Sequence, residues 1–137
     1  MQQPLKQELK DNQGVYLKIE INPENDWIYL DWIGYQDEKR TKEGMSKYLE
    51  LMKSHRIKKI LSDNRNQHGP YPAGIDQWIG SEWLPEAIRI GFKAGATVLS
   101  PKVFSKLSAN NLVQNVGGVT YKNFEKMDEA VNWLKQQ

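Results

Sequence analysis

The beginning of the chain alternates apolar and polar residues as half-buried β-strands do. Between Val15 and Ile21 every second residue is apolar, and a second β-rich run covers residues 27–33. Residues 22–26 are turn formers, and a short turn between two such runs is typical of a β-hairpin. Residues 1–13 are polar and lack this pattern, so we expect them to form a loosely ordered lead-in.

The apolar spacing then changes to the period of a helix. One predicted helix carries its apolar face at positions i, i+3, i+4 and i+7, although Gly44 inside it costs roughly 1 kcal/mol relative to alanine. This first helix is followed by a short apolar strand at 57–61, a loop rich in glycine and proline, and a second helix. In the second helix, which continues to about Ile90, Pro85 predicts a kink or a restart. The apolar positions of the two helices are Met45, Tyr48, Leu49 and Met52, and then Ile75, Trp78, Ile79 and Trp83.

The last third of the chain continues this alternation of strands and helices. A compact strand at 96–99 precedes Ser100-Pro101, a pair typical of a helix start. This helix should end at Gly117-Gly118, and it is followed by a strand at 119–124 and a final amphipathic helix. The expected apolar positions of the two helices are Val103, Phe104, Leu107 and Val113, and then Met127, Ala130, Val131 and Leu134.

The predicted order of elements is β-β-α-β-α-β-α-β-α. Strands that alternate with helices are joined by right-handed crossovers and form a mostly parallel sheet. We therefore predict an α/β fold over residues 1–137, as a single layered domain in which helices cover a central sheet with an N-terminal antiparallel hairpin.

Composition narrows the function classes. The chain has 137 residues and no cysteine, which excludes disulfides, thiolate metal sites and cysteine nucleophiles. Neither a signal peptide nor a membrane span is visible, so we expect a cytoplasmic protein. The net charge is only +2, and the basic residues flank one predicted helix as a solvated rim would, which disfavours a nucleic-acid partner.

The most polar string of the chain follows its middle strand. It consists of Asp63, Asn64 and Arg65, with His68 and Tyr71 close behind. In open α/β sheets ligands bind beyond the carboxyl ends of the strands, so these residues form a candidate site for a ligand or a partner. The alternative is that they hold the loop against the next strand end.

Trp78 and Trp83 of the second predicted helix add to this candidate site. Their spacing of five residues does not fit one narrow helical stripe. Either one of them is partly exposed and marks an interface or an apolar groove, or a wide buried face uses both.

No catalytic residue, metal ligand or cofactor is predicted. A metal site would need His68 with several carboxylates, and no spacing suggests one. The Gly-x-Ser-x-Gly elbow, the Gly-x-Gly-x-x-Gly turn and the Walker motif do not occur in the sequence. The enzymatic alternative is an acid–base pair of Asp63 and His68, in a hydrolase or transferase that also uses Arg65.

Several short motifs between Val15 and Leu134 together resemble a known family. They are similar to a bacterial family of small stand-alone STAS domains, often described as STAS/SEC14-like and related in fold to anti-sigma-factor antagonists. The motifs are Trp32-x-Gly34, Leu61-x-Asp63-Asn64-Arg65, Trp78-Ile79, Trp83-Leu84-Pro85-x-Ala87, Gly91 and Ala96-x-Val98.

The resemblance implies a non-enzymatic interaction module. In the antagonist branch a serine after the central strand is phosphorylated, but here the string from Asp63 to Gly69 contains no serine. Ser62 lies one residue before Asp63, and Ser81 is too far along the second helix. We therefore predict no phosphoacceptor.

These observations order three hypotheses. The first is a STAS-like regulatory or protein-interaction domain, whose partner is another protein or a second copy of the chain bound through the hairpin or the second helix. The second is a small-ligand carrier for an apolar, lipid-like molecule. The third is a hydrolase or transferase that uses Asp63, Arg65 and His68.

Structure separates the three hypotheses. A deep apolar cavity under Trp78 and Trp83 would favour the carrier, and a flat exposed patch there would favour the interaction domain. An enzyme would need His68 within hydrogen-bond reach of Asp63 in an open cleft.

Overall fold

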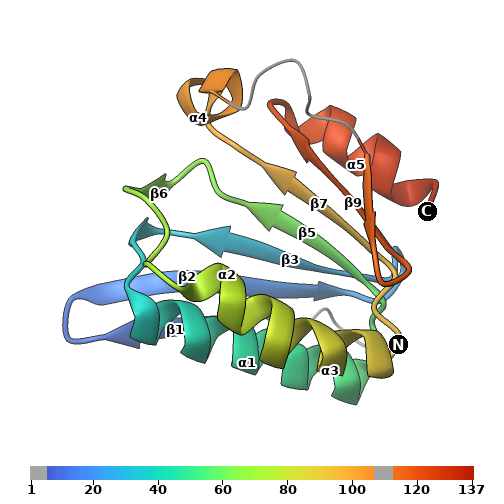
Figure 1. Ribbon diagram of the computed structural model, residues 1–137, viewed down its shortest axis with the longest axis horizontal. Helices are drawn as coiled ribbons and strands as arrows, with labels where there is room; N and C mark the ends of the chain where they lie inside the picture. The colour runs from blue at the N-terminus through green and yellow to red at the C-terminus, as the bar shows by residue number, and fades with distance from the viewer. Residues whose placement is uncertain (1–5, 107–112) are drawn as a thin grey trace.

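A seven-stranded mixed sheet organises the computed structural model, which describes residues 6–106 and 113–137 (Figure 1). Its four central strands are parallel, and antiparallel strands flank them on both sides. This arrangement confirms the predicted α/β class with its N-terminal antiparallel hairpin. The strand order is β1 (Lys6–Asp11), β2 (Gly14–Asn22), β3 (Trp27–Trp32), β5 (Lys59–Asp63), β7 (Ala94–Val98), β9 (Val119–Phe124) and β8 (Gln114–Val116).

Helices cover the two faces of the sheet unequally. α1 (Glu38–His55) and the continuous helical run of α2 (Ile75–Trp78), η1 (Ile79–Trp83) and α3 (Leu84–Arg89) lie on one face, and α5 (Met127–Lys135) lies on the other (Figure 1). α4 (Pro101–Lys106) follows β7. A separate two-stranded ribbon pairs β4 (Gly34–Tyr35) with β6 (Gln67–His68).

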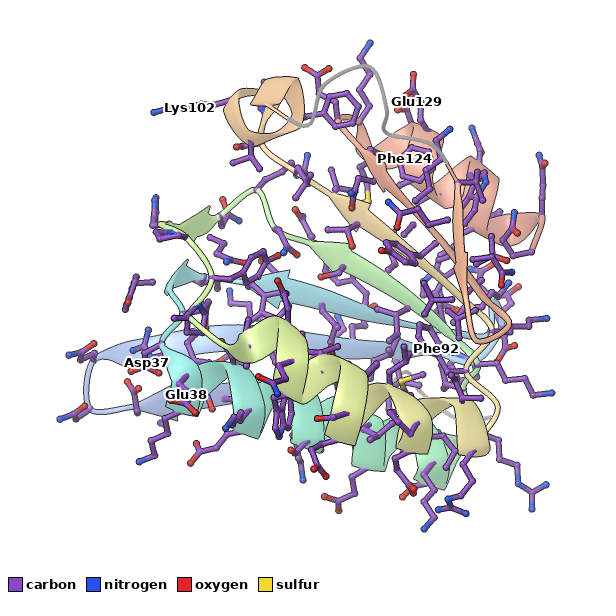
Figure 2. All side chains as sticks on the ribbon, in the orientation of Figure 1. Asp37, Glu38, Phe92, Lys102, Phe124 and Glu129 are labelled. Atoms are coloured by element: carbon purple, nitrogen blue, oxygen red, sulfur yellow. The ribbon has the colours of Figure 1, made fainter. Side chains whose placement is uncertain are left out.

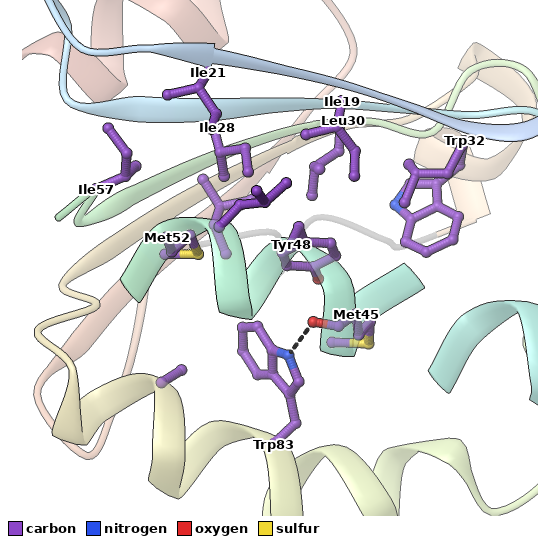
Figure 3. Close-up of a cluster of buried hydrophobic side chains, with 14 of the residues drawn as sticks. Ile19, Ile21, Ile28, Leu30, Trp32, Met45, Tyr48, Met52, Ile57 and Trp83 are labelled. Carbon is purple, nitrogen blue, oxygen red and sulfur yellow. Dashed lines mark hydrogen bonds between the residues drawn. The ribbon is translucent and has the colours of Figure 1, made fainter. Parts of the chain in front are cut away.

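The alternating residues of the strands build two hydrophobic clusters. The larger one lies between β2, β3 and α1, where Leu17, Ile28, Leu30 and Met52 are fully buried (Figure 3). The smaller cluster lies beneath α5 and includes Phe124 (Figure 2). The ring centre of Phe124 lies 5.7 Å from that of Trp133. β3 and β5 therefore send successive side chains into different clusters, as Trp27 and Ile28 or Ile60 and Leu61 do.

The second predicted helix widens in its middle. The N–H of Leu84 donates to the carbonyl oxygen of Ile79, five residues earlier, which makes η1 a π-helical turn. Pro85 follows at once, and proline can neither donate a backbone hydrogen bond nor fit against the preceding turn of a regular helix. The regular α-helix expected to kink or restart at Pro85 is thus interrupted by a π-helical turn, and α3 begins at Leu84.

The expected loose lead-in is wrong for residues 6–11, which form edge strand β1. β1 pairs antiparallel with β2, with Leu9 opposite Leu17. Its side chains are largely exposed, so the strand is held by main-chain pairing and needs no apolar alternation. Residues 1–5 of that predicted segment lie outside the described residues.

The helix expected from Ser100 to Gly117 is also wrong at its C-terminal end, where Gln114–Val116 form strand β8. α4 is described from Pro101 to Lys106, and residues 107–112 of the expected helix lie outside the described residues. β8 and β9 form a hairpin in which Gly117 and Gly118 have φ values of 62° and 91°. Positive φ at both central residues is the requirement of a two-residue hairpin turn, which glycine meets without strain. Val103 and Val113 are exposed and do not form the apolar face expected of them, and Leu107 lies outside the described residues.

Candidate functional site

A cavity lies between the sheet and the helical run 75–89. Its volume is about 680 Å³, within the roughly 300–1,000 Å³ that small-molecule sites occupy. Three strands form its floor, β5, β7 and β9, while α1, α2 and η1 contribute its walls and roof.

The floor changes from apolar to polar along the strands. Parallel register places Ile60, Gly95 and Tyr121 side by side, and two residues further on Ser62, Thr97 and Asn123. All six line the cavity. Gly95 leaves room above the floor, since an added Cβ would meet only Phe92 and a backbone oxygen at ordinary contact distances of 3.4 and 3.8 Å.

Aromatic rings form the apolar wall. Trp32, Tyr48, Trp83 and Phe92 make successive edge-to-face contacts, with centroids 6.4, 5.8 and 5.8 Å apart, and all four line the cavity. The indole N–H of Trp83 donates to the backbone oxygen of Met45 at 2.9 Å (Figure 3). This bond links η1 to α1. Phe92, the last ring of the series, lies between α3 and the strands (Figure 2). The wall is therefore built from residues with few free rotamers.

Asn64 organises the polar rim of the cavity. Its side-chain oxygen accepts from the hydroxyl of Ser62 at 2.6 Å, and its amide nitrogen donates to Tyr71 Oη at 2.6 Å and to Gln67 Oε1 at 3.2 Å. Asn64 and Tyr71, two predicted site residues, therefore do lie together at a cavity. Tyr71 is 54% exposed and marks the mouth.

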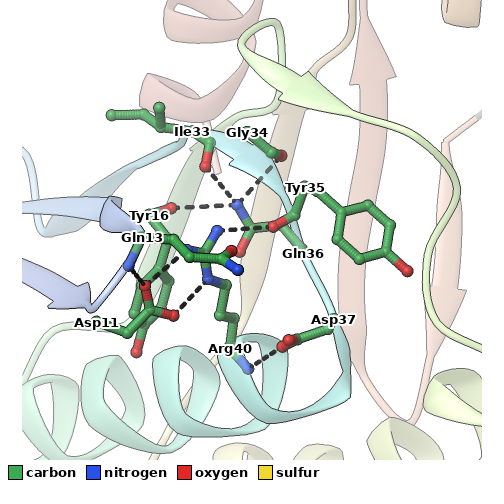
Figure 4. Close-up of polar contacts among 9 residues, drawn as sticks. All are labelled: Asp11, Gln13, Tyr16, Ile33, Gly34, Tyr35, Gln36, Asp37 and Arg40. Carbon is green, nitrogen blue, oxygen red and sulfur yellow. Dashed lines mark hydrogen bonds and ion pairs between the residues drawn. The ribbon is translucent and has the colours of Figure 1, made fainter.

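Gln36 is a buried polar group in the wall. Its amide nitrogen donates to the backbone oxygens of Tyr16, Ile33 and Gly34 at 3.2, 2.8 and 3.4 Å (Figure 4). Three carbonyl acceptors settle the orientation of this amide, because the reverse orientation would oppose oxygen to oxygen. The other atom, Oε1, is buried without a hydrogen-bond partner among the residues described.

Asp63 and Arg65 lie on the other face of the sheet, away from the cavity. Asp63 is buried and accepts from Arg65 Nε and Nη2 at 2.9 and 2.8 Å and from the hydroxyl of Tyr29 at 2.9 Å. Burial raises the pKa of Asp63, but the hydrogen bonds from Arg65 and Tyr29 outweigh it and leave the pKa below its usual value. The charges of Asp63 and Arg65 thus neutralise each other at the end of β5.

The five polar residues predicted to form one candidate site therefore do not all lie together. Side chains of successive strand residues point to opposite faces, so Ser62 reaches the cavity and Asp63 reaches the side of α5. His68 is exposed on β6, and the hydrogen bonds of Asp63 within the described ranges run to Tyr29 and Arg65. The geometry expected of an acid–base pair of Asp63 and His68 is not formed.

Trp78 and Trp83 have different surroundings. Trp83 is 5% exposed and lines the cavity. Trp78 is half-buried against the same cluster and lies under the ammonium group of Lys42, 5.6 Å from its ring centre. One tryptophan is thus a wall residue, and the other packs outside the cavity.

Sequence reasoning did not single out Gln36, Thr97 or Tyr121. A signal was present in β7, where Gly95 and Thr97 alternate with Ala94, Ala96 and Val98, but a short strand of small residues looks buried on both faces. Among residues 6–106 and 113–137, no group of three or more histidine or acidic side chains could hold a metal ion. No helix in these same ranges is long and apolar enough to cross a bilayer.

Known structures identify the fold. The chain is similar to the anti-sigma factor antagonist SpoIIAA in its unphosphorylated form, with a TM-score of 0.55 and 10% identity over 88% of this chain and 99% of that one. An uncharacterized protein of the DUF3478 family with a SpoIIAA-like fold, from Shewanella loihica PV-4, matches with a TM-score of 0.48 and 14% identity over 96% of this chain and 93% of that one. No family model and no curated protein matches the sequence.

The protein therefore has the STAS-like fold, an α/β fold of the SpoIIAA type. This confirms the fold that the motifs between Val15 and Leu134 resembled.

Proposed function

We propose that the protein is a non-enzymatic binding domain that holds a small, mostly apolar molecule in the cavity under the helical run 75–89. The cavity itself carries this proposal: it lies between α1, η1 and the sheet, and aromatic and aliphatic side chains dominate its lining. A carrier requires such a hollow, whereas a protein-interaction domain needs only a surface. The observation favours the ligand-binding hypothesis over the interaction hypothesis.

The proposal can be tested with Nile red, an uncharged apolar dye that fluoresces when it leaves water. We expect the wild type to give a saturable single-site isotherm. Gly95→Leu places a side chain over the cavity floor and should weaken dye binding at least about tenfold, whereas Gly95→Ala adds only a methyl group at ordinary contact distance and should retain most of it.

Asp63→Asn serves as the matched control. It changes a buried residue of β5 on the face opposite the cavity, so it should lower stability but leave dye binding intact. Thermal unfolding of each variant separates a blocked cavity from a misfolded chain. Equal dye binding by wild type and Gly95→Leu, or none by the wild type, would contradict the proposal.

A second candidate function is protein interaction, and two observations favour it. The fold is that of an anti-sigma factor antagonist. In addition, Tyr35 and Tyr71 are 57% and 54% exposed, and large exposed aromatic side chains are enriched at interfaces. The partner would be another protein or a second copy of this chain.

Light scattering tests self-association directly. If the chain dimerises through these tyrosines, wild type should have the mass of a dimer and the double variant Tyr35→Ser with Tyr71→Ser that of a monomer. A monomeric wild type would rule out the homodimer. We also propose that the chain functions as one domain in the cytoplasm, which is supported by the one seven-stranded sheet that runs through it and by the absence of cysteine.

A further inference from the structure

The polar end of the cavity contains the hydroxyl group of Thr97. Ser62 and Asn64 are bonded to each other, and Asn64 also bonds to Tyr71 and Gln67. Thr97 lies beside Ser62 in the floor and is half-buried, and its hydroxyl has no hydrogen bond to any other residue in the described part of the chain. The hydroxyl of Tyr48, in the aromatic wall, likewise has no hydrogen bond to another described residue. A half-buried hydroxyl that faces a cavity is available to a ligand.

The charge of the lining restricts what that ligand can be. The described lining residues include no lysine, arginine or histidine, and Asp76 is the only charged side chain among them. An anionic head group would lose its hydration without gaining a cation, and it would also face the Asp76 carboxylate. An uncharged polar group needs only hydrogen bonds, which Thr97 can supply.

We propose that the cavity selects amphiphiles with an uncharged, hydrogen-bonding head group, such as an alcohol or a primary amide, and that Thr97 is the head-group contact. The tail lies against Trp32, Trp83 and Phe92, while the head group lies over the row of Ser62, Thr97 and Asn123. Fatty-acid anions are rejected. This inference rests on the proposed function, because it assigns the ligand class of the same cavity.

Displacement of Nile red by two ligands of equal chain length tests the head-group preference. n-Octanol and n-octanoate carry the same tail, and near neutral pH they differ in charge. We expect n-octanol to displace the dye at a concentration at least about tenfold lower than n-octanoate. Asp76→Asn should narrow this gap by about two- to threefold, since Asp76 is exposed and its field is screened by salt.

Thr97→Val tests the assigned contact, because it removes the hydroxyl and keeps the shape of the side chain. The affinity for n-octanol should fall about fivefold relative to the control variant. Thr120→Val is the control: Thr120 is on the neighbouring strand β9 but is not a lining residue.

The outcomes separate this inference from the proposed function. If n-octanoate displaces the dye as well as n-octanol does, or if Thr97→Val leaves the n-octanol affinity unchanged, the head-group assignment is wrong and the cavity remains a binding site. If Nile red binds but neither n-octanol nor n-octanoate displaces it, the head-group assignment is also wrong. If wild type binds no dye at all, the proposed function itself fails.

Discussion

Helix α1 passes so close to β3 at Gly44 that a Cβ atom there would lie 2.6 Å from Cη2 of Trp32. Real Cβ atoms essentially never lie so close to another atom, so a larger residue here would force the buried Trp32 ring to shift, and glycine is favoured although the position lies in the middle of a helix. The same Trp32 lines the cavity. Close packing of α1 therefore fixes one wall of the site.

Gly44→Ala should destabilise the protein, even though alanine is the better helix former. Overpacking costs about 1–3 kcal/mol, and a clash with the buried Trp32 ring should cost the upper part of that range, more than the gain in helix propensity of roughly 1 kcal/mol. Gly80→Ala is the matched control, because an added Cβ there meets nothing within 4 Å. It should be neutral or slightly stabilising. Urea unfolding of both variants measures the difference, and equal midpoints would refute the argument.

Trp83→Phe should weaken the attachment of η1 to α1, because it removes the hydrogen bond between them. The phenyl ring keeps most of the aromatic packing but cannot donate to the backbone oxygen of Met45, so the free energy of unfolding should fall by about 1 kcal/mol. Hydrogen exchange in 79–83 should become faster. Trp133→Phe provides a comparison, because its indole N–H has no partner among the described residues and its loss should leave exchange in η1 unchanged.

The ion pair of Asp11 and Arg40 predicts a loss of stability in acid (Figure 4). Hydrogen bonds from the Arg40 side chain, and then from the backbone of Gln13, lower the pKa of Asp11 from 3.8 to about 2. Because the pKa is lower in the folded than in the unfolded protein, the ionised carboxylate stabilises the fold above about pH 4, and this contribution disappears as the pH falls toward 2.

Asp11→Asn isolates that contribution. Wild type should melt at a higher temperature than the variant near neutral pH, and the difference should shrink steadily between about pH 4 and pH 2. Asp63 and Glu86 also have lowered pKa values, but both are present in the two proteins and cancel in the comparison. A gap that stays constant over this range would show that the pair does not stabilise the fold.

Local pattern was enough to predict the fold where each element buries one face. Burial can be read directly from the alternation of residues 15–21 and from the helical spacing of residues 45–52. In both, the side to which each side chain points follows from its position in the element. The same logic failed for β1 and β8, which are exposed edge strands held by main-chain pairing. Exposure on both faces leaves no apolar period to detect.

The candidate site was predicted only in part, because sequence proximity is not spatial proximity on a strand. The amino-acid sequence determined that a polar string leaves the middle strand and that Pro85 interrupts the second helix. Only the tertiary structure decided that Asn64 and Tyr71 meet at a cavity while Asp63 and Arg65 pair on the opposite face. A cavity is the space left between α1, η1 and the sheet, and that space depends on how side chains distant in sequence fill the layers.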